Sequence, residues 1–339
     1  MSIGEKIQFH RKKLNLSQEE LAKKLFVSRQ TISLWEKDET VPTIDNLIHL
    51  KDIFGVTVDA LLNDDTKNNS NKNPTSLDTI CSALLYTMGI PPLKQSAPAN
   101  DKLCQYVDDT FGGKKADRII MYNPDAVAQW IYEKYPQFCG GLKYNTDVEI
   151  PLATVMPSVT PVCFATMYTG VQPSVHGIQK YEKPVLTIDT IFDALVRAGK
   201  KVAIITAYPC SISRIFLNRP VDYYHYEEGN WATVNATATE LILKDEYDFI
   251  VVYNGNYDAL MHKYGPESPE ALAELRMNDH IFSVLCELVK KHWTNHNTLI
   301  GYAMDHGCHE IDGGAGSHGL DMPEDINIVH CYKAICKKD

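Results

Sequence analysis

The sequence predicts an α/β protein with a small helical N-terminal domain and a larger domain built on a doubly wound, mostly parallel sheet. Up to about residue 63, apolar residues recur at helical spacing, and beyond the next break β-rich segments alternate with helical patterns. The break itself is a polar stretch without aliphatic or aromatic residues, which predicts a flexible linker. We therefore expect three segments: a five-helix domain at 1–65, a linker at 66–76 and the α/β domain at 77–339.

The composition is that of a globular protein. Of 339 residues, 44% are hydrophobic and 22% are charged, and the formal net charge is -10. There is no run of about 18 apolar residues and no apolar core of a signal peptide near the N-terminus. The nine cysteines form no C-x-x-C pair, which favours reduced thiols. We expect a cytoplasmic protein without membrane association.

Helix start signals divide the N-terminal domain. Ser17 with Glu20 forms a capping-box pattern, and Ser28 is suited to cap the helix that follows a short turn. The expected helices are 3–14, 17–26, 29–37, 43–54 and 57–62.

The third of these helices should present two different faces. Ile32 and Trp35 lie three residues apart and are expected in the core, whereas Arg29, Gln30 and Ser33 lie on the opposite side. Residues 1–37 carry a net charge of +4 and residues 38–65 one of −6, so the basic charge is confined to one half of the domain. Exposed Arg, Gln and Ser side chains on a short helix suit base recognition in a DNA major groove.

The segments Leu16–Ala22 and Val27–Glu36, with 41–47 and 56–62, resemble the lambda-repressor/Cro type of helix-turn-helix domain. The resemblance implies that Gln18 contacts the DNA backbone and that Arg29, Gln30 and Ser33 approach bases of double-stranded DNA. It also implies a homodimer that reads two half-sites. The alternative is a helical module used only for dimerisation or protein contact.

The second domain contains four strand candidates that alternate with helical patterns. Buried apolar strands in such an alternation indicate a parallel sheet, whose ligands gather at the carboxyl ends of the strands. The expected strands are 118–123, 201–207, 248–254 and 298–304, and the expected helices include 126–134, 189–198 and 269–291.

Four polar clusters follow strand-like segments or lie in a loop. They are the acid after Asn123-Pro124, the loop 156–163, an Asp-x-x-x-His pair, and Asp-His-Gly with a His-Gly close behind. A mixture of carboxylate and imidazole suits borderline divalent ions such as zinc. Singly, an Asp-His-Gly is usually a turn and an Asp-x-x-x-His pair a solvated helix face. The residues concerned are Asp125, Thr160, Asp258, His262, Asp305, His306 and His318.

Thr160 and Thr169, nine residues apart, precede a Pro-x-x-His-Gly-Ile motif at 173–178. With the four clusters, this pattern resembles the alkaline phosphatase superfamily, particularly its nucleotide pyrophosphatase/phosphodiesterase and phosphonoacetate hydrolase branches. The resemblance implies Thr160 as nucleophile and two divalent ions, zinc or alternatively manganese. It places one ion among Asp258, His262 and His318 and the other among Asp125, Asp305, His306 and the Thr160 oxygen.

The implied reaction is hydrolysis of a phosphate ester or phosphonate through a phospho-threonine. The relatives place an Asn that contacts a phosphoryl oxygen where this chain has Cys163, a weaker donor. They also have Gly where Ala126 follows the first Asp.

Two other functions remain open at the level of the sequence. The large domain could be a non-catalytic sensor through which a phosphorylated metabolite controls transcription. It could also be a scaffold without metal.

Overall fold

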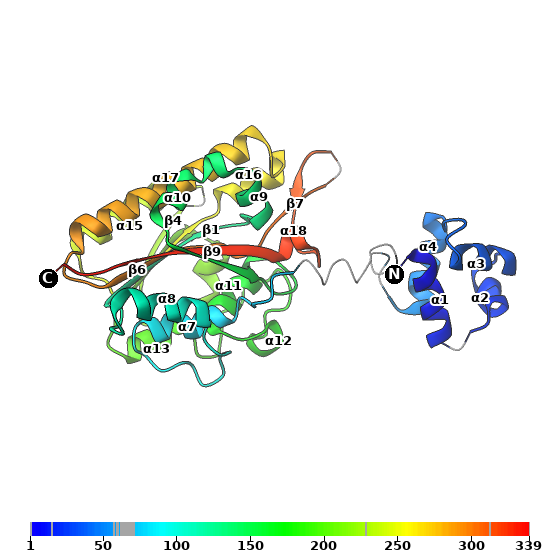
Figure 1. The fold of residues 1–339 in the computed structure, drawn as a ribbon, viewed down its shortest axis with the longest axis horizontal. Coiled ribbons are helices and arrows are strands. Elements are labelled where there is room, and N and C mark those ends of the chain that lie inside the picture. The colour runs from blue at the N-terminus through cyan, green and yellow to red at the C-terminus, as the bar shows by residue number, and fades with distance from the viewer. Residues whose placement is uncertain are drawn as a thin grey trace. The chain divides into compact units, whose positions relative to one another are not determined.

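In the computed structural model, the chain forms two compact units, residues 1–72 and 73–339 (Figure 1). The structure describes residues 2–14, 16–56, 58, 61, 72–227, 229–311 and 313–338. Among these residues, no helix combines the length and apolar character needed to cross a bilayer.

The N-terminal unit is helical, and its helices begin at side-chain caps. Ser17 accepts from the backbone of Glu20, whose carboxylate accepts from the Ser17 backbone, so the predicted capping box is present. Ser28 accepts from the Thr31 backbone at the start of the third helix, as predicted. The described helices are α1 (Ile3–Lys13), α2 (Gln18–Leu25), α3 (Arg29–Glu36) and α4 (Ile44–Phe54). The expected helix at 57–62 falls largely outside the described residues.

The helices enclose a small core that includes a buried ion pair. Ile32 and Trp35 are buried, as their spacing predicts, together with Leu21. Beside them, Arg11 donates to both carboxylate oxygens of Glu36, with Nη2 at 2.9 Å from Oε2. This buried, bidentate pair connects α1 to α3 through charge-assisted hydrogen bonds, which are stronger than bonds between neutral groups.

The segment that enters the large unit is fixed at its end. Asn73, which falls within the expected linker at 66–76, places its side-chain nitrogen 2.7 Å from Gln129 Oε1. The same nitrogen lies 3.0 and 3.2 Å from the carbonyl oxygens of Leu152 and Ile328. The composition of the stretch does not reveal these bonds, because a polar Asn suits a linker and an internal hydrogen-bonded site equally well.

The large unit is built on a seven-stranded sheet that is mostly parallel, as predicted. The strand order is β2-β9-β6-β1-β5-β3-β4, and only the β9 pairs are antiparallel. β1, β5 and β6 are buried along their whole length, as expected for strands covered on both faces. The strands are β1 (Arg118–Pro124), β2 (Val148–Ala153), β3 (Val202–Tyr208), β4 (Asp222–Glu227), β5 (Phe249–Asn254), β6 (Thr298–Ala303) and β9 (Asn327–Ile335).

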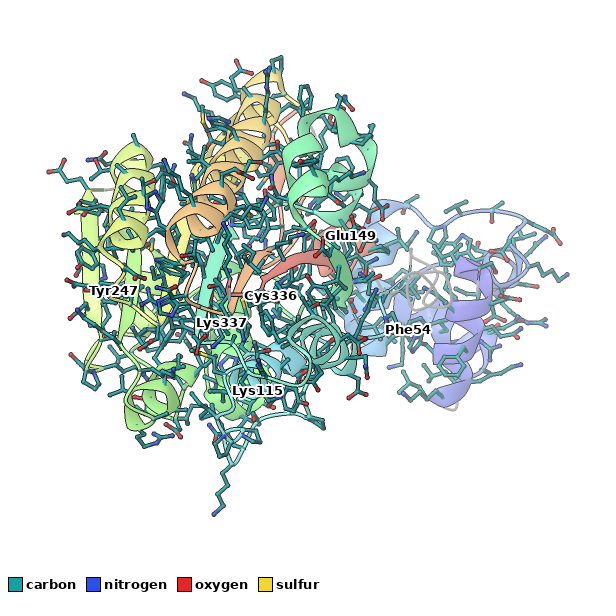
Figure 2. The ribbon with its side chains drawn as sticks, turned by 60° about the vertical axis from the view of Figure 1, so that its left-hand side comes forward. Phe54, Lys115, Glu149, Tyr247, Cys336 and Lys337 are labelled. Carbon is teal, nitrogen blue, oxygen red and sulfur yellow. The ribbon has the colours of Figure 1, made fainter. Side chains whose placement is uncertain are left out.

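Helices cover both faces of this sheet. Figure 1 shows α10 (Gly140–Asn145), α15 (Trp231–Lys244), α16 (Asn256–Tyr264) and α17 (Pro269–His292) on one side. On the other side lie α7 (Thr79–Thr87), α8 (Asp101–Phe111), α11 (Thr160–Thr169) and α13 (Ile191–Arg197). Figure 2 shows side chains filling the space between the sheet and these layers. The remaining elements are α9 (Gln129–Lys134), the 3-10 turn η1 (Pro136–Phe138), α12 (Pro173–His176), α14 (Ser211–Ile215), α18 (Pro323–Ile326) and the hairpin β7 (His309–Glu310) with β8 (Gly316–Ser317).

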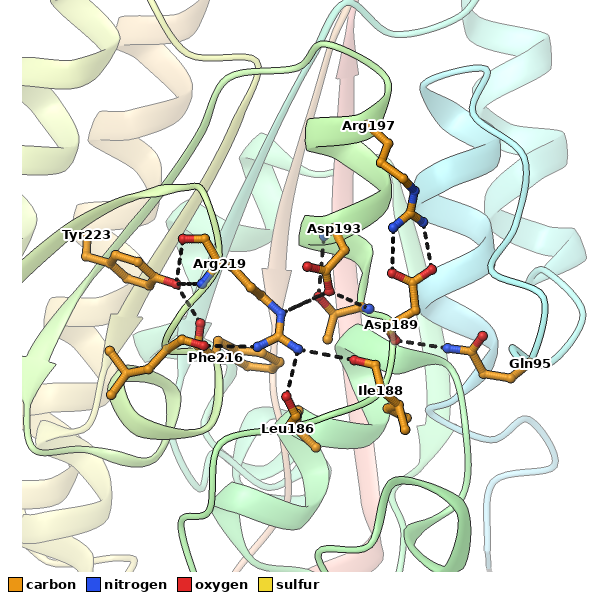
Figure 3. Close-up of polar contacts among 11 residues, drawn as sticks. Gln95, Leu186, Ile188, Asp189, Asp193, Arg197, Phe216, Arg219 and Tyr223 are labelled. Carbon is orange, nitrogen blue, oxygen red and sulfur yellow. Dashed lines mark hydrogen bonds and ion pairs between the residues drawn. The ribbon is translucent and has the colours of Figure 1, made fainter.

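Arg219, whose side chain is largely buried, joins the segment after α14 (Ser211–Ile215) to the segment that leads into α13 (Ile191–Arg197) (Figure 3). Arg219 Nε donates to Asp193 Oδ2 and to Thr190 Oγ1, each at 3.0 Å. Its terminal nitrogens donate to backbone carbonyl oxygens of Leu186, Ile188 and Leu217. Because these internal bonds occupy most donors of the guanidinium, we assign Arg219 a structural role.

Candidate metal centre and nucleophile

The first cluster consists of Asp258, His262 and His318. Asp258 and His262 lie one turn apart on α16, which follows β5, and His318 follows β8. Asp258 Oδ1 is 3.3 Å from His262 Nε2 and 3.4 Å from His318 Nε2. The two imidazole Nε2 atoms are 3.1 Å apart. The structure therefore brings together the three residues that the resemblance assigns to one ion.

The second cluster consists of Asp125, Asp305 and His306. Asp125 follows β1, and Asp305 and His306 follow β6, the neighbouring strand. His306 Nε2 lies 3.3 Å from Asp125 Oδ1 and 3.4 Å from Asp305 Oδ2. All three side chains are buried. β6, β1 and β5 are adjacent, so both clusters form at the carboxyl edge of the sheet.

Thr160 lies beside the second cluster. Its hydroxyl oxygen is 3.4 Å from both carboxylate oxygens of Asp125 and 3.3 Å from His306 Nε2. The expected loop at 156–163 ends earlier than predicted, because α11 begins at Thr160. Pro161 explains the early start, since proline is well tolerated in the first turn of a helix.

Backbone carbonyls orient all three histidines in the same way. Nδ1 lies 3.0 Å from the Gly316 oxygen in His262, 2.9 Å from the Gly307 oxygen in His306 and 3.1 Å from the Ser158 oxygen in His318. A carbonyl can only accept, so in each neutral ring Nδ1 carries the proton. Each Nε2 then directs a lone pair at the carboxylates, an arrangement typical of metal-ligating histidines.

Two buried carboxylate oxygens, one in each cluster, accept no hydrogen bond from the described residues. They are Asp258 Oδ1 and Asp305 Oδ2. Leaving such an oxygen unsatisfied away from water is costly. Divalent ions would satisfy both oxygens and the imidazole lone pairs, and hard carboxylate with borderline imidazole is the donor set that zinc or manganese accepts. The residues present therefore fit an ion in each cluster.

Burial and the close approach of charged groups shift the pKa values of residues in both clusters. Burial, followed by repulsion from Asp258, raises the pKa of Asp125 to about 7, and burial raises the pKa of Asp305 well above its ordinary value. Burial lowers the pKa of His306 to about 3. The nearby Asp258 carboxylate raises the pKa of His262 to about 9. The raised pKa values of Asp125 and Asp305 reflect the cost of burying several carboxylate charges close together.

Several contacts of the site carry no signal in the sequence. The Tyr253 hydroxyl donates to Asp125 Oδ2, although Tyr253 reads as an ordinary apolar residue near the end of a strand. Ala126 has a φ of 60° and donates its N–H to Asp305 Oδ1. Glycine adopts this left-handed conformation freely, whereas alanine costs about 1 kcal/mol. This geometry explains why a glycine is expected in relatives at the position of Ala126.

The side chain of Cys163 is fully buried one turn after Thr160. Its sulfur lies 3.1 Å from the Thr154 hydroxyl, which also donates to the Asp305 carbonyl oxygen at 2.7 Å. Burial raises the pKa of the Cys163 thiol well above its ordinary value. Contact between Cys163 and a substrate stays a prediction.

The candidate DNA contacts lie on α2 and α3. Arg29 and Gln30 are exposed at the start of α3, and Ser33 one turn later is half-buried. Gln18 Nε2 donates to Glu36 Oε2 at 3.0 Å, so an internal bond orients this side chain.

Both units match known families. Residues 144–327 match the family described as type I phosphodiesterase / nucleotide pyrophosphatase, and residues 7–61 match a helix-turn-helix family. The first match includes Thr160 and every residue of the two clusters except Asp125.

Some similar proteins resemble the helix-turn-helix unit, and others resemble the large unit. The HTH-type transcriptional activator BcrR of Enterococcus faecalis is 44% identical over 62 residues, 18% of this chain and 30% of that protein. Human ectonucleotide pyrophosphatase/phosphodiesterase family member 7 is 30% identical over 97 residues, 28% of this chain and 21% of that protein. The matched segments thus span less than a third of either relative.

The similar solved structures likewise include repressors and pyrophosphatase/phosphodiesterase proteins. The P22 c2 repressor in complex with a synthetic operator is 40% identical, with 18% of this chain and 94% of that chain covered and a TM-score of 0.18. Murine ectonucleotide pyrophosphatase/phosphodiesterase 5 is 20% identical, with 58% of each chain covered and a TM-score of 0.48.

Proposed function

The chain belongs, through residues 144–327, to the type I phosphodiesterase / nucleotide pyrophosphatase family, and from this premise we propose that it is a transcription regulator whose large domain is a two-metal phosphohydrolase. In this proposal Thr160 is the nucleophile and the substrate is a phosphorylated small molecule, either a phosphate ester or a phosphonate. The helix-turn-helix domain at 7–61 binds double-stranded DNA.

The observation that carries the catalytic proposal is the convergence of Thr160 with two clusters that each hold an unsatisfied carboxylate oxygen. The first cluster would hold one zinc or manganese ion, and the second cluster with Thr160 would hold the other. Bound ions would neutralise phosphate charge and lower the pKa of the Thr160 hydroxyl.

The chain itself supplies the positioning for the reaction. The start of α11 fixes Thr160, and the Tyr253 hydroxyl, which donates to Asp125 Oδ2, fixes the carboxylate beside it. The Thr160 hydroxyl loses its proton to solvent, and its oxygen then attacks phosphorus. This attack forms an oxygen–phosphorus bond and breaks the bond to the leaving group, which departs with its electron pair and takes up a proton. Water then hydrolyses the phospho-threonine, restoring the hydroxyl and releasing the phosphorylated product.

The DNA-binding proposal rests on the exposed side of α3. Arg29 and Gln30 can pair with guanine and adenine edges, Ser33 lies one turn further, and Gln18 at the start of α2 would contact the backbone. Repressor-like domains of this type commonly read two half-sites, so we propose a homodimer.

The catalytic proposal is tested with the purified full-length chain and bis(4-nitrophenyl) phosphate. We expect release of 4-nitrophenol that requires added Zn²⁺ or Mn²⁺ and stops with a chelator. If no phosphate mono- or diester and no phosphonate is cleaved by the metal-replete protein, catalysis is refuted and the sensor function below is favoured.

One observation favours a sensor as the second candidate function. Asn73, at the end of the connection to the helix-turn-helix domain, bonds Gln129, which lies four residues after Asp125. Ser76, three residues after Asn73, pairs with Ala153. The residue after Ala153, Thr154, donates to the Asp305 carbonyl oxygen. The connection is therefore attached to both segments that carry the second-cluster carboxylates, so occupancy of that cluster can bias it.

Coupling predicts a change in operator affinity. Zn²⁺ with orthovanadate, a phosphate analogue, should shift the DNA dissociation constant of the wild-type chain about 5-fold or more, and Asn73→Ala should reduce the shift to less than about 2-fold. The matched control is Asn295→Ala, because Asn295 is exposed in the same unit. Fluorescence anisotropy with labelled operator DNA measures the shift in the dissociation constant for each variant. An unchanged shift in Asn73→Ala would rule out this route of coupling.

A further inference from the structure

His318 depends on a hairpin that has little structure of its own. It directly follows β8, and β7 and β8 contribute two residues each, with His309 opposite Ser317. Figure 1 shows the hairpin that begins with β7 standing out from the body of the large unit. An isolated two-stranded hairpin is marginally stable in water, so contacts outside the hairpin must fix His318.

Asp325 on α18 supplies such contacts. Its side chain is fully buried although it is a carboxylate. Oδ1 lies 2.7 Å from His309 Nδ1, and Oδ2 accepts from the Leu320 N–H at 2.8 Å. These partners stand on either side of His318 in the chain, so one carboxylate holds both limbs of the hairpin.

The backbone around Asp325 also meets the second cluster. Gly307, which follows His306, donates its N–H to the Asp325 carbonyl oxygen at 2.8 Å. A Cβ on Gly307 would lie only 2.0 Å from the Glu324 carbonyl oxygen, so α18 lies directly on this backbone. Asp325 therefore links the segment with Asp305 and His306 to the limbs that carry His318. The ring centroids of His306 and His318 are 4.2 Å apart.

We propose that Asp325 is a positioning residue that sets His318 relative to the other ligands of the first cluster and to the second cluster. The inference rests on the proposed function, since it requires that the clusters bind ions. Asp325 acts through hydrogen bonds to His309 and Leu320 and contacts neither ion nor substrate. Loss of a group that hydrogen-bonds a metal ligand directly typically weakens metal binding by about 10–100-fold. Asp325 acts one bond further out, so the lower end of this range applies to it.

The test is zinc binding by the full-length chain, measured by chelator competition. Asp325→Asn keeps the shape of the side chain but removes its charge and replaces one of its two acceptor oxygens by an NH₂ group. We expect one of two zinc ions to bind about 10-fold more weakly. Glu324→Gln, the matched control, removes the same charge from the neighbouring residue of α18 and should bind both ions like the wild type.

A double-mutant cycle separates positioning from general destabilisation. If Asp325 acts through His318, zinc affinity in His318→Ala and in His318→Ala with Asp325→Asn should agree within about 2-fold. If circular dichroism shows that Asp325→Asn does not fold, His309→Gln tests the same contact and should weaken the binding of the same zinc ion. Wild-type affinity in the folded variant, or an equal further loss in the His318→Ala background, would overturn the inference and leave the proposed function standing. Absence of zinc binding by the wild type would overturn both.

Discussion

Replacing Thr160 by alanine is expected to lower kcat for a phosphodiester by about 10⁴-fold or more while the bound metal remains. The change removes the only group placed to attack phosphorus in the proposed reaction. Six charged or imidazole side chains of the two clusters stay in place to hold the ions. The measurement is single-turnover hydrolysis of bis(4-nitrophenyl) phosphate, together with metal content by elemental analysis.

Two variants control this result. Thr160→Ser keeps a hydroxyl at the start of α11 and should retain measurable turnover with a phosphorylated intermediate. Thr169→Ala makes the same substitution at the other end of the helix, where the hydroxyl bonds the Ala165 carbonyl oxygen, and should leave kcat within about 10-fold. Turnover of Thr160→Ala equal to wild type would refute the assignment of the nucleophile.

The second large effect concerns the N-terminal unit. Glu36→Ala is expected to destabilise this unit by about 3–5 kcal/mol, because it leaves the buried Arg11 guanidinium without its carboxylate. It also removes the acceptor of Gln18, which orients a proposed DNA contact. Hydrogen exchange of peptides from α2 and α3 in the full-length chain measures the loss, and operator affinity should fall with it.

The control for Glu36 is Glu39→Ala, an exposed acid that lies 4.0 Å from Lys37. It should change stability by less than about 0.5 kcal/mol. Equal protection from exchange in the Glu36 and Glu39 variants would contradict a role for the buried pair.

The same ion pair gives a pH dependence with a definite sign. Burial raises the pKa of Glu36, but hydrogen bonds from Arg11 and Gln18 outweigh burial and hold the pKa below its ordinary value of 4.5. A carboxyl whose pKa is lower in the folded state binds its proton more tightly when unfolded. Its contribution to stability is therefore fully present above about pH 4.5 and is lost as pH falls through the lower folded value.

The convergence of the two clusters is predictable from the sequence, because their carboxylates follow strand ends. Asp125, Asp258 and Asp305 each come shortly after a buried strand, and neighbouring parallel strands bring such residues to one edge of the sheet. The buried side of α3 is predicted by the same kind of periodic spacing, with Ile32 and Trp35 in the core.

What the sequence does not predict depends on contacts between distant segments. Tyr253 and Asp325 have ordinary positions in a strand and a short helix, and only the fold brings them to Asp125 and to the hairpin of His318. Asn73 is similar, because a polar residue after a polar stretch reads as linker until its partners on β2 and β9 are known. The sequence predicts Thr160 in a loop, whereas it starts α11, because a buried apolar helix that begins with Thr-Pro has no clear polar face.

The proposed reaction requires two divalent ions beside Thr160, held by residues that lie far apart in the chain. The most direct test is anomalous diffraction at the zinc edge from crystals of the zinc-loaded, full-length chain. We expect two peaks, one among Asp258, His262 and His318 and one among Asp125, Asp305, His306 and Thr160 Oγ1. Zinc-loaded crystals without a peak in either cluster, or with zinc bound only elsewhere on the surface, would contradict the account.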